Sequence, residues 1–329
     1  MAATKDFTDL EPRLAEHRSE IRGYCYRMLG SSFEAEDAVQ ETFVRAWKGY
    51  DRFEGRSALR SWLYRIATNV CLDMLNGRNR RARPVDMGPR STVDDHDLRT
   101  LPEESWVEPI PDGAVTPVGA DPADLALSRE SIRLAFVAAL QHLPPRQRAV
   151  LILREVLRWK ADEVADLLGT SVPSVNSALQ RARATLASRD LGSASEPELA
   201  SEAMDDAHEE LLARYVEAFE RYDIESLVTL LHDDAVQSMP PFALWLQGSD
   251  EIAGWMLGPG SECRGSRLVS TAANGCPAFG QYRPAESGSG HDAWALQVLD
   301  VVDGRIAAIN SFLDTARMFP LFDLPLHLD

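Results

Sequence analysis

Apolar residues recur at three- and four-residue spacing through most of the first 190 residues. Val39, Phe43 and Ala46 follow this spacing, and so do Leu59, Leu63, Ile66 and Val70 further along the chain. Residues three and four apart share one face of a helix, so the spacing predicts amphipathic helices. We expect one all-α module over residues 10–81 and a second over 128–190.

The helical spacing is absent between residues 82 and 127. This stretch carries seven prolines, at positions 84, 89, 102, 109, 111, 117 and 122. Proline removes a backbone donor and interrupts regular elements, and the stretch is also acidic. Residues 82–127 are therefore predicted to form an acidic linker, and the polar residues 191–203 a shorter hinge.

The pattern changes class after residue 203. An amphipathic helix is predicted over 204–222, with short helical stretches around 224–232 and 249–257. Strand-like runs follow at 267–274, 278–283, 293–302 and 305–314, and Asp303-Gly304 provides a hairpin turn between the last two. Helices followed by an antiparallel sheet predict an α+β cone or open barrel over 204–329, so the whole chain is expected to be multidomain.

The distribution of charge changes the meaning of the net charge of −17. Lysines and arginines less aspartates and glutamates give +3 for residues 1–90, −8 for 91–127, +4 for 128–190 and −16 for 191–329. Only the two helical modules are basic enough to approach nucleic-acid phosphates.

The remaining composition indicates a soluble, cytoplasmic chain. No run of about 18 apolar residues predicts a membrane span, and the N-terminus lacks the apolar core of a secretory signal. Four cysteines, Cys25, Cys71, Cys263 and Cys276, lie far apart without the spacing of a metal site or a disulfide framework. We therefore expect neither a metal nor a cofactor.

Two stretches of the first module combine charge with aromatic residues. Residues 33–47 place Glu36, Asp37, Gln40 and Glu41 opposite the apolar stripe, which by itself is equally typical of a solvated surface. Residues 51–65 mix arginines with Phe53, Trp62 and Tyr64, the combination that binds single-stranded DNA through phosphate contacts and base stacking. Trp62 and Tyr64 would also suit a hydrophobic core.

The second module ends in a predicted helix-turn-helix over residues 160–186. Gly169 supplies the turn, Ser171 caps the second helix, and Pro173 falls in its first turn. The outward positions of that helix carry hydrogen-bonding and basic side chains, which can reach base edges and phosphates in the major groove: Ser174, Asn176, Ser177, Gln180, Arg181 and Arg183.

The order of these segments resembles an extracytoplasmic-function (ECF) sigma factor of the sigma-70 family. The segments are LGSSFEAEDAVQETFVRAW, FEGRSALRSWLYRIATNVCLD, LPPRQRAVLILREV and the final SALQRARATL, and the likeness covers roughly residues 10–190. The resemblance implies a subunit that directs RNA polymerase core to promoters and initiates transcription.

The same resemblance implies a role for each segment. Residues 36, 37, 40 and 41 would help dock on the β′ clamp helices, the start of the 128–190 module would sit on the β flap, and the helix 172–186 would read the −35 element. The −10 element would be opened and read by Tyr50, Phe53, Arg56, Ser57, Arg60, Trp62, Arg65 and Asn69.

The C-terminal residues resemble the SnoaL-like polyketide cyclase and ketosteroid isomerase cone fold. The candidates for a pocket there are Tyr222, His232, Asp234 and Trp245, with Asp233 beside them, but no catalytic carboxylate is identifiable. We expect this acidic domain to regulate the sigma modules in cis rather than to act as an enzyme. A small-molecule sensor and an active isomerase or cyclase are the alternatives.

A different class of protein also has these parts. A one-component repressor would use the helix-turn-helix and a C-terminal sensor, but it would leave residues 33–65 without a function. The sigma factor explains both regions.

Overall fold

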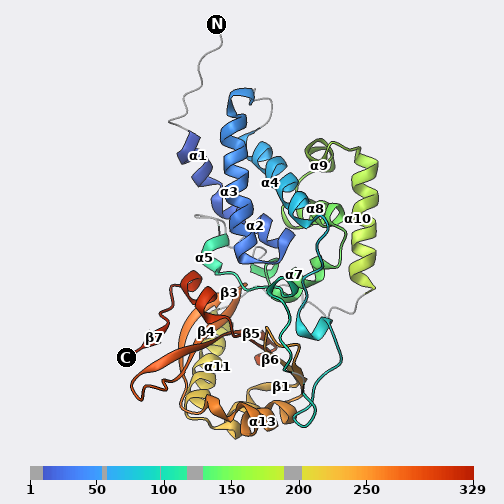
Figure 1. Ribbon diagram of the computed structural model, residues 1–329. Coiled ribbons are helices and arrows are strands. Elements are labelled where there is room, and N and C mark those ends of the chain that lie inside the picture. Colours follow the sequence, from blue (N-terminus) through green and yellow to red (C-terminus); the bar gives the residue numbers. More distant parts are fainter. Residues whose placement is uncertain (1–9, 54–57, 97, 117–128, 189–201) are drawn as a thin grey trace. The chain divides into compact units, whose positions relative to one another are not determined.

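The computed structural model describes residues 10–53, 58–96, 98–116, 129–188 and 202–329, and the chain forms two compact units (Figure 1). One unit comprises residues 1–81 and 107–194, and the other comprises residues 82–106 and 195–329. The first is helical and the second contains the sheet. The predicted combination of helical modules with an α+β domain is confirmed.

The first module consists of α1 (Leu10–Glu16), α2 (Arg18–Leu29), α3 (Ser32–Gly49) and α4 (Leu59–Leu75). Gly30 ends α2 with φ of 73°, a left-handed conformation that glycine adopts without strain. Ser31 then caps α3, because its hydroxyl accepts a hydrogen bond from the Glu34 amide at 3.2 Å. Gly30 and Ser31 therefore form the turn between α2 and α3.

The second module consists of α7 (Leu134–Gln141), α8 (Pro145–Leu151), a π-helical turn (Ile152–Val156), α9 (Ala161–Leu168) and α10 (Val172–Ala187). Gly169 adopts φ of 60° after α9, and the Ser171 hydroxyl accepts from the Ser174 amide at 3.4 Å. Val175, Leu179 and Ala182 face inward on α10. The predicted helix-turn-helix is confirmed, with its turn and cap where the sequence placed them.

Both helical modules pack together within the first unit. Arg148 of α8 is buried and its guanidinium donates to the carbonyl oxygens of Met28, Gln141 and Leu143. The Tyr64 and Trp159 rings meet edge to face at 5.1 Å between centroids. Separate modules on a tether were the expectation, but apolar and polar side chains of both modules form one core here.

The second unit is built on a seven-stranded sheet with the order β2-β1-β6-β5-β4-β3, and β7 pairs with β5. Its strands are β1 (Leu231–Ser238), β2 (Trp245–Gln247), β3 (Arg267–Ala273), β4 (Cys276–Pro284), β5 (His291–Val302), β6 (Arg305–Phe312) and β7 (His327–Leu328). Bulges interrupt the register of β4 with β5 and of β5 with β6, and such bulges bend a sheet. The predicted strands are present.

Three helices cover the sheet: α11 (Glu202–Glu220), α12 (Ile224–Thr229) and α13 (Ser249–Leu257). They enclose a hydrophobic core that includes Phe219, Leu227, Trp255 and Leu299, and α11 lies along the sheet (Figure 1). Asp303 and Gly304 form the predicted turn with φ of 50° and 71°. The sequence had not indicated β1, whose first residues were assigned to a helix.

The N-terminal half of the expected linker belongs to the second unit. Residues 82–96 and 98–106 lie along β2 and α13, and the helical turns among these described residues are η3 (Pro84–Asp86) and η4 (Glu103–Ser105). The next residues, including α5 (Asp112–Val115), pack on α2 in the first unit, where the Glu108 amide donates to the Gly30 carbonyl at 2.9 Å. Much of the predicted linker is therefore docked rather than free. Across the described ranges, no helix is long and apolar enough to cross a membrane.

Candidate nucleic-acid interface

Helix α10 exposes the side chains that the sequence assigned to it. Ser174, Asn176, Gln180, Arg181 and Arg183 are exposed, and Ser177 is half-buried. Asn176 and Gln180 are four residues apart and so lie on one face of the helix. Side-chain amides on one face can each form paired hydrogen bonds with an adenine edge.

The two arginines of α10 have different surroundings. Arg181 donates to the Ser177 hydroxyl at 2.7 Å, which leaves most of its donors available. Arg183 forms an ion pair with Glu155 at 2.6 Å. A carboxylate next to Arg183 offsets its positive charge, so Arg181 is the stronger candidate for a phosphate contact.

A hollow of about 310 Å³ lies between α3 and α4 in the first module. It is lined by Arg45, Gly49, Trp62, Ile66 and Asn69. The Trp62 ring stacks on Phe53 at 4.8 Å between centroids, and Phe53 stacks on Tyr50 at 6.2 Å. Four of the residues assigned to the −10 element thus meet at or behind this hollow, and an aromatic wall beside an amide suits an unstacked base.

Three residues of the hollow were missed from sequence. Ile66 lies four residues after Trp62 and three before Asn69, so the helical spacing already placed it on the same face. Gly49 gives room for the indole, since an added Cβ would come within 3.3 Å of the Trp62 ring. Arg45 forms ion pairs with Glu41 and Asp73 at 2.7 and 3.1 Å. No local pattern marks these last two residues.

The other residues assigned to the −10 element do not line the hollow. Arg60 forms an ion pair with Glu20 at 2.7 Å and lies over the Trp159 ring at 5.6 Å. Arg65 donates to the Asp166 carbonyl of α9 at 3.0 Å. Both arginines therefore contact the second module in this structure. Arg56 and Ser57 lie outside the described residues.

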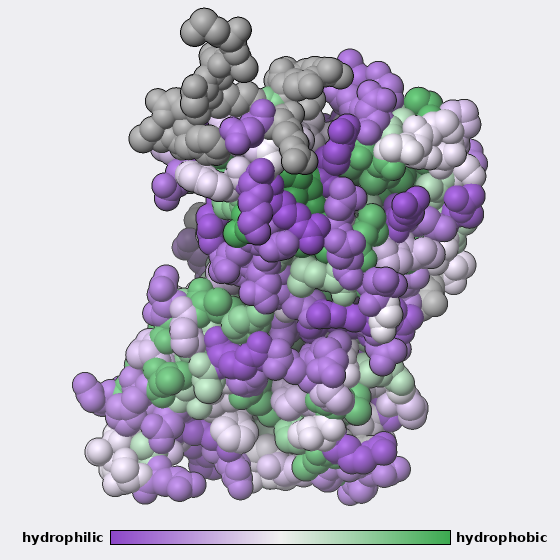
Figure 2. Space-filling model, turned by 45° about the horizontal axis from the view of Figure 1, so that its top comes forward, coloured by the Kyte–Doolittle hydropathy of each residue, from purple (hydrophilic) through white to green (hydrophobic). Residues whose placement is uncertain are grey.

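Most of the acidic face of α3 is exposed to solvent, where another protein could contact it. Asp37, Gln40 and Glu41 are exposed, whereas Glu36 forms ion pairs with Arg18 and Arg22. Val44 and Trp47, 44% and 46% exposed, continue the same helix face. On the side of the whole molecule shown in Figure 2, hydrophilic residues predominate and hydrophobic residues form separate patches between them. Two large apolar side chains beside polar ones are typical of a protein interface, and the sequence had not singled them out.

The four candidates for a C-terminal pocket are dispersed. The Tyr222 hydroxyl donates to the carbonyls of Met256 and Gly260 at 2.5 and 3.0 Å, and the Trp245 indole N–H donates to Gly88 at 3.1 Å. His232 and Asp234 form a partly exposed pair at 2.6 Å on β1. The hydrogen bonds of Tyr222 and Trp245 are thus committed to backbone groups, and the four side chains line no described cavity together.

The interior of the sheet domain carries a neutral chain of hydrogen bonds. The Tyr215 hydroxyl donates to Gln297 at 2.8 Å, Gln297 donates to Gln281 at 2.9 Å, and Gln281 donates to Ser266 at 3.1 Å. Burial raises the pKa of Tyr215, so its hydroxyl stays protonated. The buried polar side chains of the described part of this unit are all neutral: Gln237, Ser238, Ser266, Asn274, Gln281, Gln297 and Ser311.

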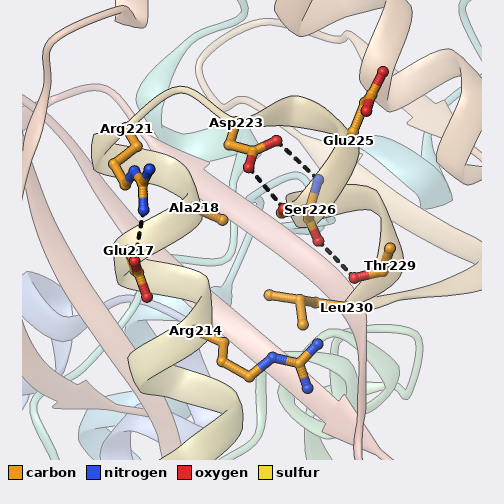
Figure 3. Close-up of a pocket in the computed structure, with 9 residues that line it drawn as sticks. All are labelled: Arg214, Glu217, Ala218, Arg221, Asp223, Glu225, Ser226, Thr229 and Leu230. Atoms are coloured by element: carbon orange, nitrogen blue, oxygen red, sulfur yellow. Dashed lines mark hydrogen bonds and ion pairs between the residues drawn. The ribbon is translucent and has the colours of Figure 1, made fainter.

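A groove of about 440 Å³ lies outside this interior, between α11 and α12 (Figure 3). Its polar groups pair locally: Arg221 with Glu217 at 2.9 Å, and Asp223 with the hydroxyl and amide of Ser226 at 2.7 and 3.1 Å. These Ser226 hydrogen bonds lower the pKa of Asp223, which is therefore ionised and acts as the cap of α12. Asp223 and Ser226 thus serve the start of α12, and Arg221 and Glu217 pair along one helix face.

These features define a class of protein, a multidomain transcription factor with two DNA-reading helical modules and an added sheet domain. Family models match accordingly: Sigma-70 region 2 over residues 14–81, Sigma-70 region 4 over 133–186, and a SnoaL-like domain over 212–309.

Similar proteins agree with these matches. The chain is 47% identical to the ECF RNA polymerase sigma factor SigG of Mycobacterium tuberculosis, with 96% of this chain and 84% of that protein covered. It is 26% identical to SigJ of the same organism, over 89% and 88%. The crystal structure of SigJ matches with a TM-score of 0.60 and 22% identity, over 97% of this chain and 100% of that one. The chain belongs to the ECF RNA polymerase sigma factors, which direct transcription initiation.

Proposed function

We propose that this sigma factor binds RNA polymerase core, reads a −10 and a −35 promoter element with separate modules, and is regulated in cis by its C-terminal domain. The proposal is supported by two surfaces of one chain whose side chains suit DNA. These are the exposed face of α10, with its amides and arginines, and the aromatic hollow between α3 and α4. Such a protein acts in the cytoplasm, where polymerase and promoters are.

The exposed face of α3 is the surface proposed to dock on the polymerase, at the β′ clamp helices. Asp37, Gln40 and Glu41 supply charge and hydrogen bonds there, while Val44 and Trp47 supply apolar area. Glu36 contributes indirectly in this arrangement, because its ion pairs with Arg18 and Arg22 tie α3 to α2. The first helices of the second module would contact the β flap.

The hollow is proposed to receive a base that is flipped out of the −10 element. Flipping costs a few kcal/mol, and stacking on an aromatic side chain is worth about 1–3 kcal/mol per base. Trp62 provides the stacking surface and Asn69 a hydrogen-bonding edge, whereas the charge of Arg45 is offset by Glu41 and Asp73. Arg60, Arg65 and the undescribed Arg56 and Ser57 would reach the DNA once the second module moves away.

The −35 element is proposed to bind α10. Asn176 and Gln180 would read base edges, and Arg181 would contact a phosphate. Ser174 and Ser177 lie on the same helix near its N-terminus, which favours contact with the backbone.

Regulation in cis fits the C-terminal domain better than catalysis does. A proton-transferring cone enzyme needs a carboxylate in a shielded pocket, whereas the described buried polar groups here are neutral. The domain also holds part of the linker between the two DNA-reading modules. Through this contact with the linker, the domain can influence the two helical modules that the linker connects.

Run-off transcription with bacterial core polymerase on a promoter library tests the proposal, comparing the full chain with one ending at Ala200. We expect both proteins to initiate at the same promoters, and the shorter one more strongly if the domain inhibits. Equal output from the two would contradict regulation in cis. If neither initiates while both bind duplex DNA specifically, the chain acts as a one-component repressor instead.

A further inference from the structure

The two walls of the aromatic hollow belong to different helices. Trp62, Ile66 and Asn69 lie on α4, whereas Gly49 and Arg45 lie on α3. Residues of one helix keep fixed distances from one another, because backbone hydrogen bonds set the rise at about 1.5 Å per residue. The width of the hollow therefore depends on the spacing between α3 and α4.

Helices α3 and α4 pack side by side and run in opposite directions (Figure 1). Gly49 at the end of α3 lies against Trp62 near the start of α4, and Arg45, one turn earlier on α3, reaches Asp73 near the end of α4. Asp73 lies one turn beyond Asn69, so the ion pair stands at the end of the hollow away from the Trp62 ring. Two contacts between the helices thus flank the hollow.

The first contact limits how closely the helices approach each other. An added Cβ at Gly49 would come within 3.3 Å of the Trp62 ring, so the indole already rests on the backbone of α3. The ring also stacks on Phe53 at 4.8 Å between centroids. Little room is left for the Trp62 ring to move further toward α3.

The second contact opposes separation of the helices. Arg45 Nε donates to Glu41 at 2.7 Å, and its Nη1 donates to Asp73 at 3.1 Å. Glu41 lies one turn before Arg45 on the same helix and fixes the conformation of the arginine, while Asp73 is the partner on the opposite helix. The hydrogen bonds to Glu41 and Asp73 raise the pKa of Arg45, so it stays charged. A single exposed ion pair contributes little to stability, but a guanidinium held by two carboxylates has a defined position.

The ion pairs also change what the hollow attracts. Arg45 lines it, and an unpaired guanidinium there would attract any DNA phosphate regardless of sequence. The carboxylates of Glu41 and Asp73 offset that charge. The lining that remains is an indole, an aliphatic side chain and an amide, which suit an uncharged base.

We propose that Arg45 and Asp73 are positioning residues of the hollow, whose ion pair holds α3 and α4 at the separation at which an unstacked base can lie on Trp62 and reach Asn69. This inference rests on the proposed function of the hollow. Neither residue touches the base, and both act through the helix that carries Trp62 and Asn69. Without the pair, α4 shifts away from α3, which weakens contacts with that base but not contacts elsewhere on the DNA.

The test measures DNA binding by holoenzyme, assembled from bacterial core polymerase and the full chain, at a promoter found by run-off transcription. The probe is a fork-junction fragment whose −10 element is single-stranded, and each −10 base in turn is replaced by an abasic site. The hollow occupies the position where the abasic site weakens binding by the wild type but has no further effect on Trp62→Ala. At that position the wild type should lose about tenfold in affinity, which corresponds to about 1.4 kcal/mol.

Two variants remove the ion pair from either side. Arg45→Met removes the charge but keeps the apolar stem, and Asp73→Ala removes the partner on α4. In each variant the loss caused by the abasic site should fall to about threefold, and the double variant should fall no further, because the two residues act as one unit.

Two further variants serve as controls. Asp73→Glu keeps a carboxylate within reach of Arg45 and should retain the wild-type loss at the abasic site. Arg78→Ala removes a different exposed ion pair, with Glu34 at the other end of α3, and should retain it as well.

Two results would overturn the proposal. One is a loss at the abasic site that stays at the wild-type value in Arg45→Met and Asp73→Ala, even if both bind every probe more weakly. A general effect on stability or a lost phosphate contact changes all probes alike. The other is a double variant whose change is the sum of the two single changes, which would show that the residues act separately.

Failure of the proposed function looks different. In that case no −10 position loses its abasic effect in Trp62→Ala, whichever residues stand at positions 45 and 73. The hollow would then bind no base, and the ion pair would have nothing to position.

Discussion

At the scale of single residues, packing decides which aromatic side chain is available to DNA. Tyr64 is fully buried between Tyr24 and Trp159, with ring centroids at 5.2 and 5.1 Å, whereas Trp62 two residues earlier lines the hollow. Trp62→Ala should therefore reduce initiation about tenfold or more, since base stacking is worth about 1–3 kcal/mol. Permanganate reactivity of −10 thymines in the polymerase complex measures the opening directly.

Trp62→Phe is the matched control, because it keeps an aromatic face and should retain most of the activity. A template that is already unpaired across the −10 element should restore part of the Trp62→Ala activity. If Trp62→Ala opens the promoter normally, the hollow is not the base-binding site.

A second residue-scale prediction concerns Arg148, which is 3% exposed. Burial lowers the pKa of its guanidinium to about 10, so the group remains charged at neutral pH and depends on its carbonyl partners. Arg148→Met leaves three backbone carbonyls without their donor and should lower the free energy of unfolding by about 2–4 kcal/mol in urea denaturation. Arg146→Met on the exposed side of α8 should change it by less than about 0.5 kcal/mol. Equal losses from both would contradict a specific role for the buried group.

At the scale of elements, the recognition helix illustrates how a neighbouring segment changes what a helix offers. Arg181 and Arg183 look equivalent in sequence, but Glu155 pairs only with Arg183 at 2.6 Å. Arg181→Ala should weaken transcription from all promoters by a similar factor, whereas Arg183→Ala should have a smaller effect. Gln180→Ala should relax specificity at one −35 position by about 1–3 kcal/mol.

Run-off assays on promoters with single −35 substitutions separate these effects. Glu155→Gln removes the carboxylate charge beside Arg183 and should increase the loss caused by Arg183→Ala. A uniform loss for Gln180→Ala across all −35 variants would show that this side chain does not read a base.

At the scale of the whole molecule, the first unit holds both DNA-reading modules in contact, through Arg65 with Asp166 and Tyr64 with Trp159. Promoter elements lie too far apart for one compact unit, so initiation requires the modules to separate. A cleavable bismaleimide between cysteines placed at Arg65 and Asp166 should abolish run-off transcription, and cleavage should restore it. Cys263→Ser is included, because Cys25, Cys71 and Cys276 are already buried.

The same double-cysteine protein without the reagent is the control, because it carries both substitutions but no cross-link, and it should transcribe more than the cross-linked protein. Full transcription by the cross-linked protein would show that the modules work without separating.

Much of this organisation followed from sequence. Helical spacing located both modules, Gly169 and Ser171 located the turn and cap of the helix-turn-helix, and Asp303-Gly304 located a hairpin, because each depends on backbone preferences of nearby residues. The family also followed from the order of these local motifs. The hollow was only half predicted, since Gly49 and Arg45 come from a different helix than Trp62 and Asn69.

Only the tertiary structure decided which of the described segments are covered by contacts with distant parts of the chain. The same acidic, proline-rich residues that read as an open linker are bound along a sheet edge, because β2 supplied backbone partners that local sequence does not reveal. Arginines assigned to DNA contact the second module, and the Trp245 indole donates to the Gly88 carbonyl within residues 82–106. Local composition determined the elements and the family of this protein, whereas contacts between residues far apart in the chain determined which of its surfaces are covered.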